Sequence, residues 1–279
     1  MRKPDISLFA SAIKPHLWRP LLDSLKSNKL SYEVVFAGYI DAGLVKEVTD
    51  DYPELRYITT LDIKPAQCYE VASRACEGQY LIWISDDCEF SEGALDKIYR
   101  KMMSIQYSDI LAIKTFDPEC LNNNLDDNRF FPRNLNTPQM ASVGCIARNY
   151  LRYLGGFDRR YIYGKFECDL CMRVLASSRG GRIIKYEEVE VKIDHTSKNW
   201  EYNNDWSGVN EDSETLENSW VVGGYKDFEK PIFCLNQSGI YPYYPISNRE
   251  VTFNRSDKFE PYEDKDILEK SQSKNTRWL

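Results

Sequence analysis

The sequence predicts an α/β protein in which helices flank a largely parallel sheet. Three observations support this class. The first half of the 279-residue chain alternates short β-rich runs with helix-compatible segments, which is the pattern of βαβ units. One run, Tyr80–Ile84, has no polar alternation, as expected for a central strand that is buried on both faces. The periodic pattern ends after Asn199, so we expect a main domain at residues 1–199 and an irregular extension at 200–279 that wraps it.

Local patterns place the elements of the first half. Strand-length runs rich in β-branched and aromatic residues lie at Ile6–Ala10, Tyr32–Ala37, Leu55–Thr59, Tyr80–Ile84 and Ile110–Lys114. Three segments between them repeat apolar residues on one helical face, namely Pro20–Ser27, Pro65–Cys76 and Gly93–Met103. These spacings predict helices that cover a sheet.

The second half is less regular. Phe116–Pro138 is rich in Asn, Asp, Pro and Arg, which predicts an irregular excursion that is long enough to suggest a function. Further elements are expected as a strand at Gln139–Ala147, a short helix at Asn149–Leu154, a helix at Phe166–Ala176 and a strand at Val189–Ile193. In the extension, polar clusters are interrupted by aromatic residues, with little helical periodicity before Asp264–Lys274.

Composition excludes several classes of protein. The formal net charge of −7 and the lack of any Lys/Arg block argue against a surface that tracks a nucleic-acid backbone. Eight cysteines are scattered through core-like segments of a chain that is long enough to fold without disulfides, which favours reduced thiols and a cytoplasmic location. The sequence has no apparent signal-peptide core, and no stretch approaches the length of a membrane span.

An acidic cluster follows the most apolar strand. Asp86, Asp87 and Glu89 stand where ligands gather in open α/β sheets, beyond the carboxyl end of the strand. Burying a carboxylate costs free energy unless a cation or a hydrogen-bond donor pairs with it, so the cluster suggests a site for a hard metal ion. The alternative is a helix N-cap cluster that leads into Gly93–Met103.

Two separated blocks of sequence carry a family resemblance. Residues 75–87, Ala-Cys-Glu-Gly-Gln-Tyr-Leu-Ile-Trp-Ile-Ser-Asp-Asp, are similar to the turn, strand and Asp-x-Asp motif of family 2-like glycosyltransferases. Leu154–Asp158 and Phe166–Arg173 resemble the Gly-Gly-Phe-Asp turn and the acidic helix of that family. The resemblance covers about residues 5–196, and it implies a GT-A fold with a mixed, mostly parallel sheet.

The resemblance also implies a metal site for Mn²⁺ or Mg²⁺. Alignment on Gly78 puts Ser85 at the first Asp of the metal motif and Asp87 at the last, so Asp87 is the expected ligand. Asp86 then has a supporting role on the donor side, together with Ser85. His195 follows a predicted strand, where GT-A enzymes often supply a histidine ligand, and is the second expected ligand.

Donor and acceptor sites follow from the same comparison. The loop that contains Ala10, Ser11 and Ala12 is where the family binds the nucleotide. The acidic residue that usually ends the second strand is replaced by Phe36-Ala37-Gly38, and Asp41 lies a few residues further on as a candidate donor contact. Glu167 occupies the position of the catalytic base of the family, with Asp169 as its competitor.

We therefore predict an inverting transferase that moves a sugar from a UDP- or GDP-sugar to a hydroxyl of a glycan or lipid-linked saccharide. Its expected location is cytoplasmic, with peripheral binding at the inner membrane as an option, and residues 200–279 could form an acceptor-side lid. A modified nucleic-acid base or a protein is an alternative acceptor, although the acidic charge disfavours nucleic acid. The rival class is a non-catalytic saccharide- or nucleotide-binding module, suggested by the departures at Phe36, Ser85 and Phe166.

Overall fold

The computed structural model describes residues 3–40, 42–60, 64–116 and 141–193 of the main domain. From the extension it describes 211–212, 214–216, 219–223, 230–231, 252–255 and 259–261. Asp41, His195 and the predicted excursion after Phe116 lie outside these residues, apart from Phe116 itself. The same is true of nearly all the aromatic residues in the extension.

One mixed sheet of eight strands forms the centre of the domain, in the order β3-β2-β1-β4-β7-β6-β8-β5. Pairing is parallel from β3 through β4 and between β6 and β8, whereas β7 runs antiparallel to both of its neighbours and β5 runs antiparallel to β8. The strands are β1 Ile6–Ser11, β2 Tyr32–Gly38, β3 Leu55–Thr59, β4 Tyr80–Trp83, β5 Cys88–Phe90, β6 Ile110–Phe116, β7 Val143–Ala147 and β8 Ile183–Ile193. The predicted mixed, mostly parallel sheet is confirmed.

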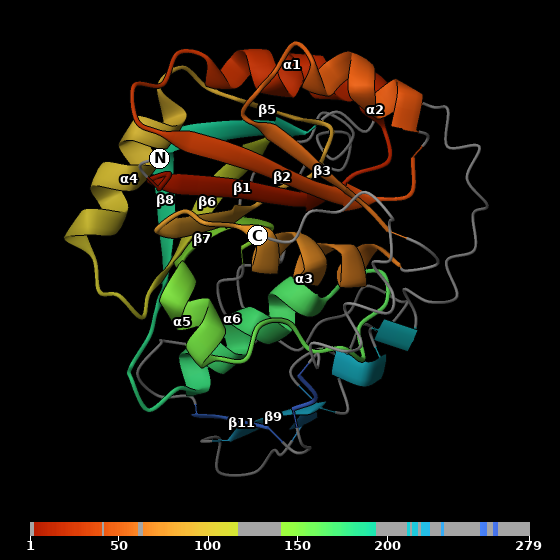
Figure 1. Cartoon of the computed structure of the whole chain (residues 1–279). Coiled ribbons are helices and arrows are strands. Elements are labelled where there is room, and N and C mark those ends of the chain that lie inside the picture. Colours follow the sequence, from red (N-terminus) through yellow and green to blue (C-terminus); the bar gives the residue numbers. More distant parts are fainter. Residues whose placement is uncertain are drawn as a thin grey trace.

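Helices cover both faces of this sheet (Figure 1). They are α1 Pro15–Leu25, α2 Ala42–Thr49, α3 Pro65–Ala75, α4 Ala94–Ser104, α5 Arg148–Tyr153 and α6 Phe166–Ala176. Strands β1, β2 and β3 follow one another in one direction along the sheet, so right-handed crossovers put α1 and α2 on the same face. The return from β3 to β4 reverses that direction and puts α3 on the opposite face, where α5 and α6 also pack (Figure 1).

A second, small sheet belongs to the extension. It joins β9 Trp220–Gly223 to β10 Lys230–Pro231 and β11 Thr252–Arg255, and β11 lies near α6. Residues of the extension also touch the main domain directly, because Asp158 forms an isolated β-bridge with Pro261 and the Arg159 side chain donates to Glu260 at 2.9 Å. These contacts fall on the turn between α5 and α6.

Several element boundaries differ from the sequence prediction. Helix α1 begins at Pro15 rather than Pro20, because Pro15 occupies the first helical position, where a missing N–H is tolerated. Helix α2 and the short strand β5 were not predicted, since each has too few residues for a clear period. Strand β8 begins at Ile183, six residues early, because its first part alternates apolar residues with exposed charged ones.

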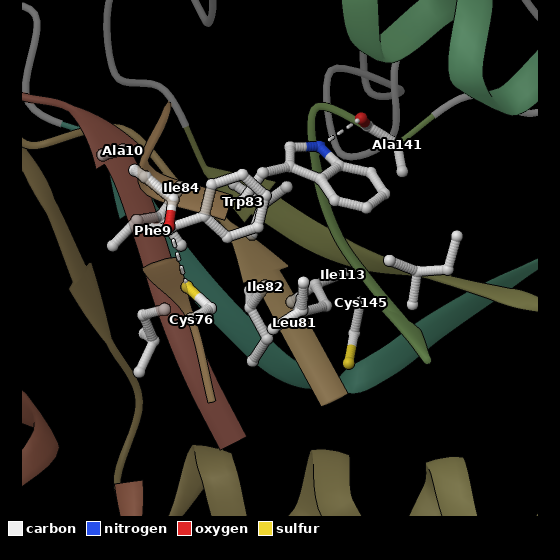
Figure 2. Packing of buried hydrophobic residues seen from close by; sticks show 14 of the residues in the cluster. Phe9, Ala10, Cys76, Leu81, Ile82, Trp83, Ile84, Ile113, Ala141 and Cys145 are labelled. Carbon is white, nitrogen blue, oxygen red and sulfur yellow. Dashed lines mark hydrogen bonds between the residues drawn. The ribbon is translucent and has the colours of Figure 1, made fainter. Parts of the chain in front are cut away.

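Buried side chains of β4 pack in the middle of the sheet, as Figure 2 shows for Leu81, Ile82 and Trp83. Trp83 is fully buried, and its indole nitrogen donates to the Ala141 carbonyl oxygen at 3.1 Å. Gly144 of β7 is the register partner of Trp83, and a β-carbon on Gly144 would overlap the indole ring. Glycine at position 144 therefore lets the large ring lie flat across the neighbouring strand.

We predict that Gly144→Ala lowers the free energy of unfolding by about 1–3 kcal/mol, the usual effect of overpacking a core. Urea denaturation with an unchanged m-value measures this effect. Gly164→Ala is the matched control, because a β-carbon there meets no atom within 4 Å, and its change should stay within about 0.5 kcal/mol. Equal unfolding midpoints for the two variants would contradict this account of the core.

Candidate active site

The loop between β1 and α1 is held against the carboxyl ends of two strands. The Ala12 N–H donates to the Ala37 carbonyl oxygen at 2.9 Å, and the Tyr57 hydroxyl donates to the Ala12 carbonyl oxygen at 3.2 Å. A β-carbon on Gly38 would overlap that same Ala12 oxygen. The departure from an acidic residue at the end of β2 thus has a local structural reason, since Gly38 makes room for the loop.

Asp86 fixes the same loop from the other side. Its Oδ2 atom accepts hydrogen bonds from the Ile13 N–H at 2.8 Å, the Lys14 N–H at 2.9 Å and the Trp18 indole at 3.3 Å. Asp86 is buried, and burial raises the pKa of its carboxyl group even though Lys14 and these donors act in the opposite direction. Asp86 therefore anchors the loop that contains the predicted nucleotide contacts Ala10, Ser11 and Ala12.

Asp87 holds a cation instead. Its Oδ2 atom is paired with the ammonium group of Lys14, and its Oδ1 atom accepts a hydrogen bond from the Ser85 hydroxyl. The Asp87 side chain is 0% exposed, and that of Lys14 is 19% exposed. Ser85, which stands where the metal motif has its first acidic residue, thus orients the last one.

Glu167 is the second residue of α6 and belongs to the other acidic block. Its Oε2 atom is buried and has no hydrogen-bond partner among the described residues. Burial raises the pKa of the Glu167 carboxyl group, the nearby Lys165 lowers it and the carboxylate of Asp212 raises it further. Lys165 has a left-handed backbone with φ of 63°, which is uncommon for a residue with a side chain and typical of functional sites.

Tyr69 of α3 joins the two acidic blocks. Its hydroxyl donates to the Ile84 carbonyl oxygen at 2.6 Å, just before the Asp86-Asp87 pair, and its ring lies 4.6 Å from that of Phe166. Burial raises the pKa of Tyr69, and the negative charges of Asp86, Glu167 and Asp87 raise it further. Tyr69 thus contacts the chain near both acidic blocks, through the Ile84 carbonyl oxygen and the Phe166 ring, whereas the sequence suggested only a packing role for it.

Asp169, the competitor of Glu167, has a different environment. It is fully buried, and the Arg173 Nε atom donates to its carboxylate at 2.7 Å. The same guanidinium group donates to the Leu154 and Gly156 carbonyl oxygens at 2.9 and 2.8 Å. Asp169 therefore orients an arginine that ties α6 to the Gly-Gly turn.

Glu70 secures that turn from α3. Its carboxylate accepts from the Phe157 N–H at 2.9 Å and from the Arg74 side chain at 2.7 Å. Gly156 has φ of 79°, and a β-carbon there would lie 2.6 Å from Glu70 Oε1, so a side chain at this position would disrupt the contact. Burial raises the pKa of Glu70, with Arg74 acting in the opposite direction.

Asp212 of the extension secures the loop that leads to Glu167. Its carboxylate is buried and accepts hydrogen bonds from the Ile162, Tyr163 and Gly164 N–H groups at 2.8, 2.6 and 2.8 Å. The sequence prediction missed both Glu70 and Asp212. The only signal for Glu70 was a lone acidic residue on the apolar face of a helix, and Asp212 had none.

The described residues contain neither a cluster of metal-binding side chains nor a helix that could span a membrane. Among these, no group of three or more His, Cys, Asp or Glu side chains could hold a metal ion. The predicted ligand His195 lies outside this part of the chain, as does the predicted donor contact Asp41. None of the helices seen here is long and apolar enough to cross a membrane.

Comparison with known proteins gives structural matches only, because no protein-family model and no curated sequence matches. The mannosyltransferase PcManGT from Pyrobaculum calidifontis, in complex with GDP-Man and Mn²⁺, is similar with a TM-score of 0.54 and 14% identity, over 72% of this chain and 59% of that one. TarS 1-349 from S. aureus, in complex with UDP-GlcNAc, has a TM-score of 0.53 and 14% identity, over 77% of this chain and 67% of that one. A second structure of TarS 1-349 matches with a TM-score of 0.51 and 15% identity, over 67% and 60% of the two chains.

The chain therefore spans about three fifths of the mannosyltransferase that it matches. The mixed, mostly parallel sheet and its flanking helices agree with these structures. At such low identity the likeness concerns the fold, and the chain has the GT-A glycosyltransferase fold.

Proposed function

We propose that this chain is an inverting glycosyltransferase that moves a sugar from a UDP- or GDP-sugar to a hydroxyl group of a glycan or lipid-linked saccharide. One observation carries the proposal, namely that Tyr69 links two buried acidic groups, because it donates to the Ile84 carbonyl oxygen near Asp87 and packs on Phe166 beside Glu167. Asp87 is paired with an ammonium group, and Glu167 Oε2 has no hydrogen-bond partner among the described residues. Structural neighbours in complex with GDP-Man and UDP-GlcNAc support a nucleotide-sugar donor. A modified nucleic-acid base or a protein remains the alternative acceptor.

Glu167 is the proposed general base. An inverting transfer needs a carboxylate that removes the proton of the acceptor hydroxyl while its oxygen attacks the anomeric carbon. The buried Oε2 atom has a free lone pair for this proton, and the raised pKa of Glu167 makes it a stronger base than an exposed carboxylate. Asp169 is less suitable because its carboxylate is engaged by Arg173.

The donor side is proposed to lie between the β1–α1 loop and Asp87. Ala10, Ser11 and Ala12 would face the nucleotide, while Asp86 keeps the loop in place through three N–H donors. Asp87 suits a cation, because it already pairs with an ammonium group, whereas the Oδ2 atom of Asp86 is engaged. Asp87 and His195 would hold Mn²⁺ or Mg²⁺, an ion that neutralises charge on the departing diphosphate when it is bound.

The extension is proposed to support the acceptor side. Asp212 fixes the loop at residues 162–164 directly before Lys165 and Glu167, so it sets where the base stands. This contact favours the view that residues 200–279 wrap the domain at 1–199. A cytoplasmic location, with or without peripheral binding at the inner membrane, stays a prediction.

A non-catalytic binding module is the second candidate function. The departures at Phe36, Ser85 and Phe166 suggested it, but Ser85 and Gly38 have structural roles that are compatible with a working donor site. A module that only binds has no use for a buried carboxylate oxygen, Glu167 Oε2, that accepts no hydrogen bond from the described residues, since such an atom destabilises the fold. Glu167 therefore favours the enzyme.

The first prediction about the proposed function concerns the donor. Calorimetric titration of the full chain with a panel of UDP- and GDP-sugars, with and without Mn²⁺, should find at least one donor that binds, and that donor should be hydrolysed slowly when no acceptor is present. Binding without any turnover, even with added saccharide acceptors, would favour the binding module. A panel with no response at all would remove the proposed function.

The second prediction concerns Glu167→Gln. Turnover should fall by about 10²–10⁴-fold, the usual contribution of a general base, while donor affinity is kept and the melting temperature does not fall. In the parent chain, kcat/KM should rise with pH through the pKa of Glu167, which is above that of an ordinary glutamate, because only the ionised form accepts the proton. The variant should lose this limb of the profile.

Glu187→Gln is the matched control, since Glu187 is an exposed glutamate on β8, and it should keep both the rate and the pH profile. Unchanged turnover in Glu167→Gln would assign the base to another residue. Loss of donor affinity instead of turnover would mean that Glu167 serves binding.

The third prediction concerns Asp212→Ala, which leaves three partly buried N–H groups without their acceptor. Stability should fall by about 2–4 kcal/mol, and amide exchange at residues 162–164 should accelerate. Turnover should fall while donor affinity stays the same, because this loop borders the base and not the donor site. Glu211→Ala removes the exposed neighbour and serves as the control; faster exchange at 162–164 with full turnover would refute the positioning role.

A further inference from the structure

Lys14 binds the acidic pair at two points. Its backbone N–H donates to Asp86 Oδ2 at 2.9 Å, and its ammonium group pairs with Asp87 Oδ2 and lies 4.0 Å from Asp86 Oδ1. The backbone of this residue is thus held in place, whereas its ammonium group is carried on a stem of four carbons with several rotatable bonds. Only the ammonium group can leave the acidic pair while the loop stays intact.

This arrangement places a positive charge where a divalent cation would bind. Asp87 has two oxygens, and the Ser85 hydroxyl and the Lys14 ammonium group occupy one each. Because the Asp87 side chain is fully buried, two cations on it would repel each other with little screening by solvent. Lys14 and a divalent cation therefore compete for the same carboxylate.

A diphosphate would change the outcome of this competition. The diphosphate oxygens are stronger hydrogen-bond acceptors for the Lys14 ammonium group than the single Asp87 oxygen that it now contacts. The lysine side chain is flexible, so the ammonium group can move to them. If the ammonium group moves to the diphosphate, Asp87 becomes available to a metal ion.

We propose that Lys14 is an internal counter-ion that keeps divalent cations off Asp87 until a nucleoside diphosphate draws its ammonium group away. Metal and nucleotide then bind as a coupled pair, each raising the affinity of the other by the same factor, as thermodynamic linkage requires. This inference rests on the proposed function for its nucleotide but not for its competition step, which involves Lys14, Asp87 and the metal alone.

The test begins with Mn²⁺ alone. Calorimetry on the full chain should give weak Mn²⁺ binding in the parent protein and binding at least about tenfold tighter in Lys14→Met, the effect of removing one charge-assisted hydrogen bond. Lys14→Arg keeps the charge and should stay as weak as the parent. Lys46→Met, which breaks an exposed Lys–Asp pair on α2, is the matched control and should also bind like the parent.

The second stage repeats the titration with saturating UDP or GDP. Nucleotide should tighten Mn²⁺ binding at least about tenfold in the parent protein and clearly less in Lys14→Met, in which the competition is already absent. Thermal melting of all variants shows whether each is folded.

Equal Mn²⁺ affinities for the parent protein and a folded Lys14→Met, or no Mn²⁺ binding by either, would overturn the competition. If nucleotide tightens Mn²⁺ binding equally in the parent protein and in Lys14→Met, diphosphate does not release Lys14 from Asp87. If EDTA does not weaken nucleotide binding, Lys14 replaces the metal ion permanently, and the proposed release is also wrong. Failure of the proposed function is distinguishable, because it removes nucleotide binding and leaves the result with Mn²⁺ alone unchanged.

Discussion

The carboxylate of Asp86 is the point on which the site depends. It links the end of β4 to the β1–α1 loop through the N–H groups of Ile13 and Lys14 and to α1 through the indole of Trp18. Each of these donors comes from a segment about seventy residues earlier in the chain. Without this carboxylate, the part of the loop at Ile13 and Lys14 would lose the acceptor of its two N–H groups, and with it the contact that keeps Lys14 beside Asp87.

Helix α3 performs a second, complementary task through two adjacent residues. Tyr69 donates to the Ile84 carbonyl oxygen next to the donor side, and Glu70 accepts from Phe157 at the turn that precedes α6. Because neighbouring residues on a helix point about 100° apart, Tyr69 and Glu70 can contact two different segments, one after β4 and one before α6. The separation between the metal motif and the proposed base is thus set by a rigid element rather than by the loops, which suits a reaction that depends on geometry.

How much of this the sequence could predict depends on the range of the interaction. The apolar runs of β1, β2, β4 and β6 and the apolar faces of α3, α4 and α6 identify these elements locally, and they were predicted with small errors at the ends. The bonds from Glu70 to Phe157 and from Asp212 to residues 162–164 join positions 87 and about 50 residues apart, so no local pattern reveals them. Lys14 lies in the loop that was expected to bind the nucleotide, but its pairing with Asp87, 73 residues later, was missed for the same reason.

Asp86 and Glu167 are both buried acids with a raised pKa, yet they differ in what surrounds them. Since the folded state holds these protons more tightly than the unfolded chain, each group favours folding most at acidic pH, and this contribution is lost as pH rises towards the folded-state pKa. Asp86 offsets part of that loss with three N–H donors that position a loop. Glu167 Oε2 has no such compensation among the described residues, so its burial at neutral pH weakens the fold without supporting it. A carboxylate in that environment makes physical sense where a proton must be accepted from a bound hydroxyl, and this is the reason for proposing a catalytic role for Glu167 rather than a role in binding alone.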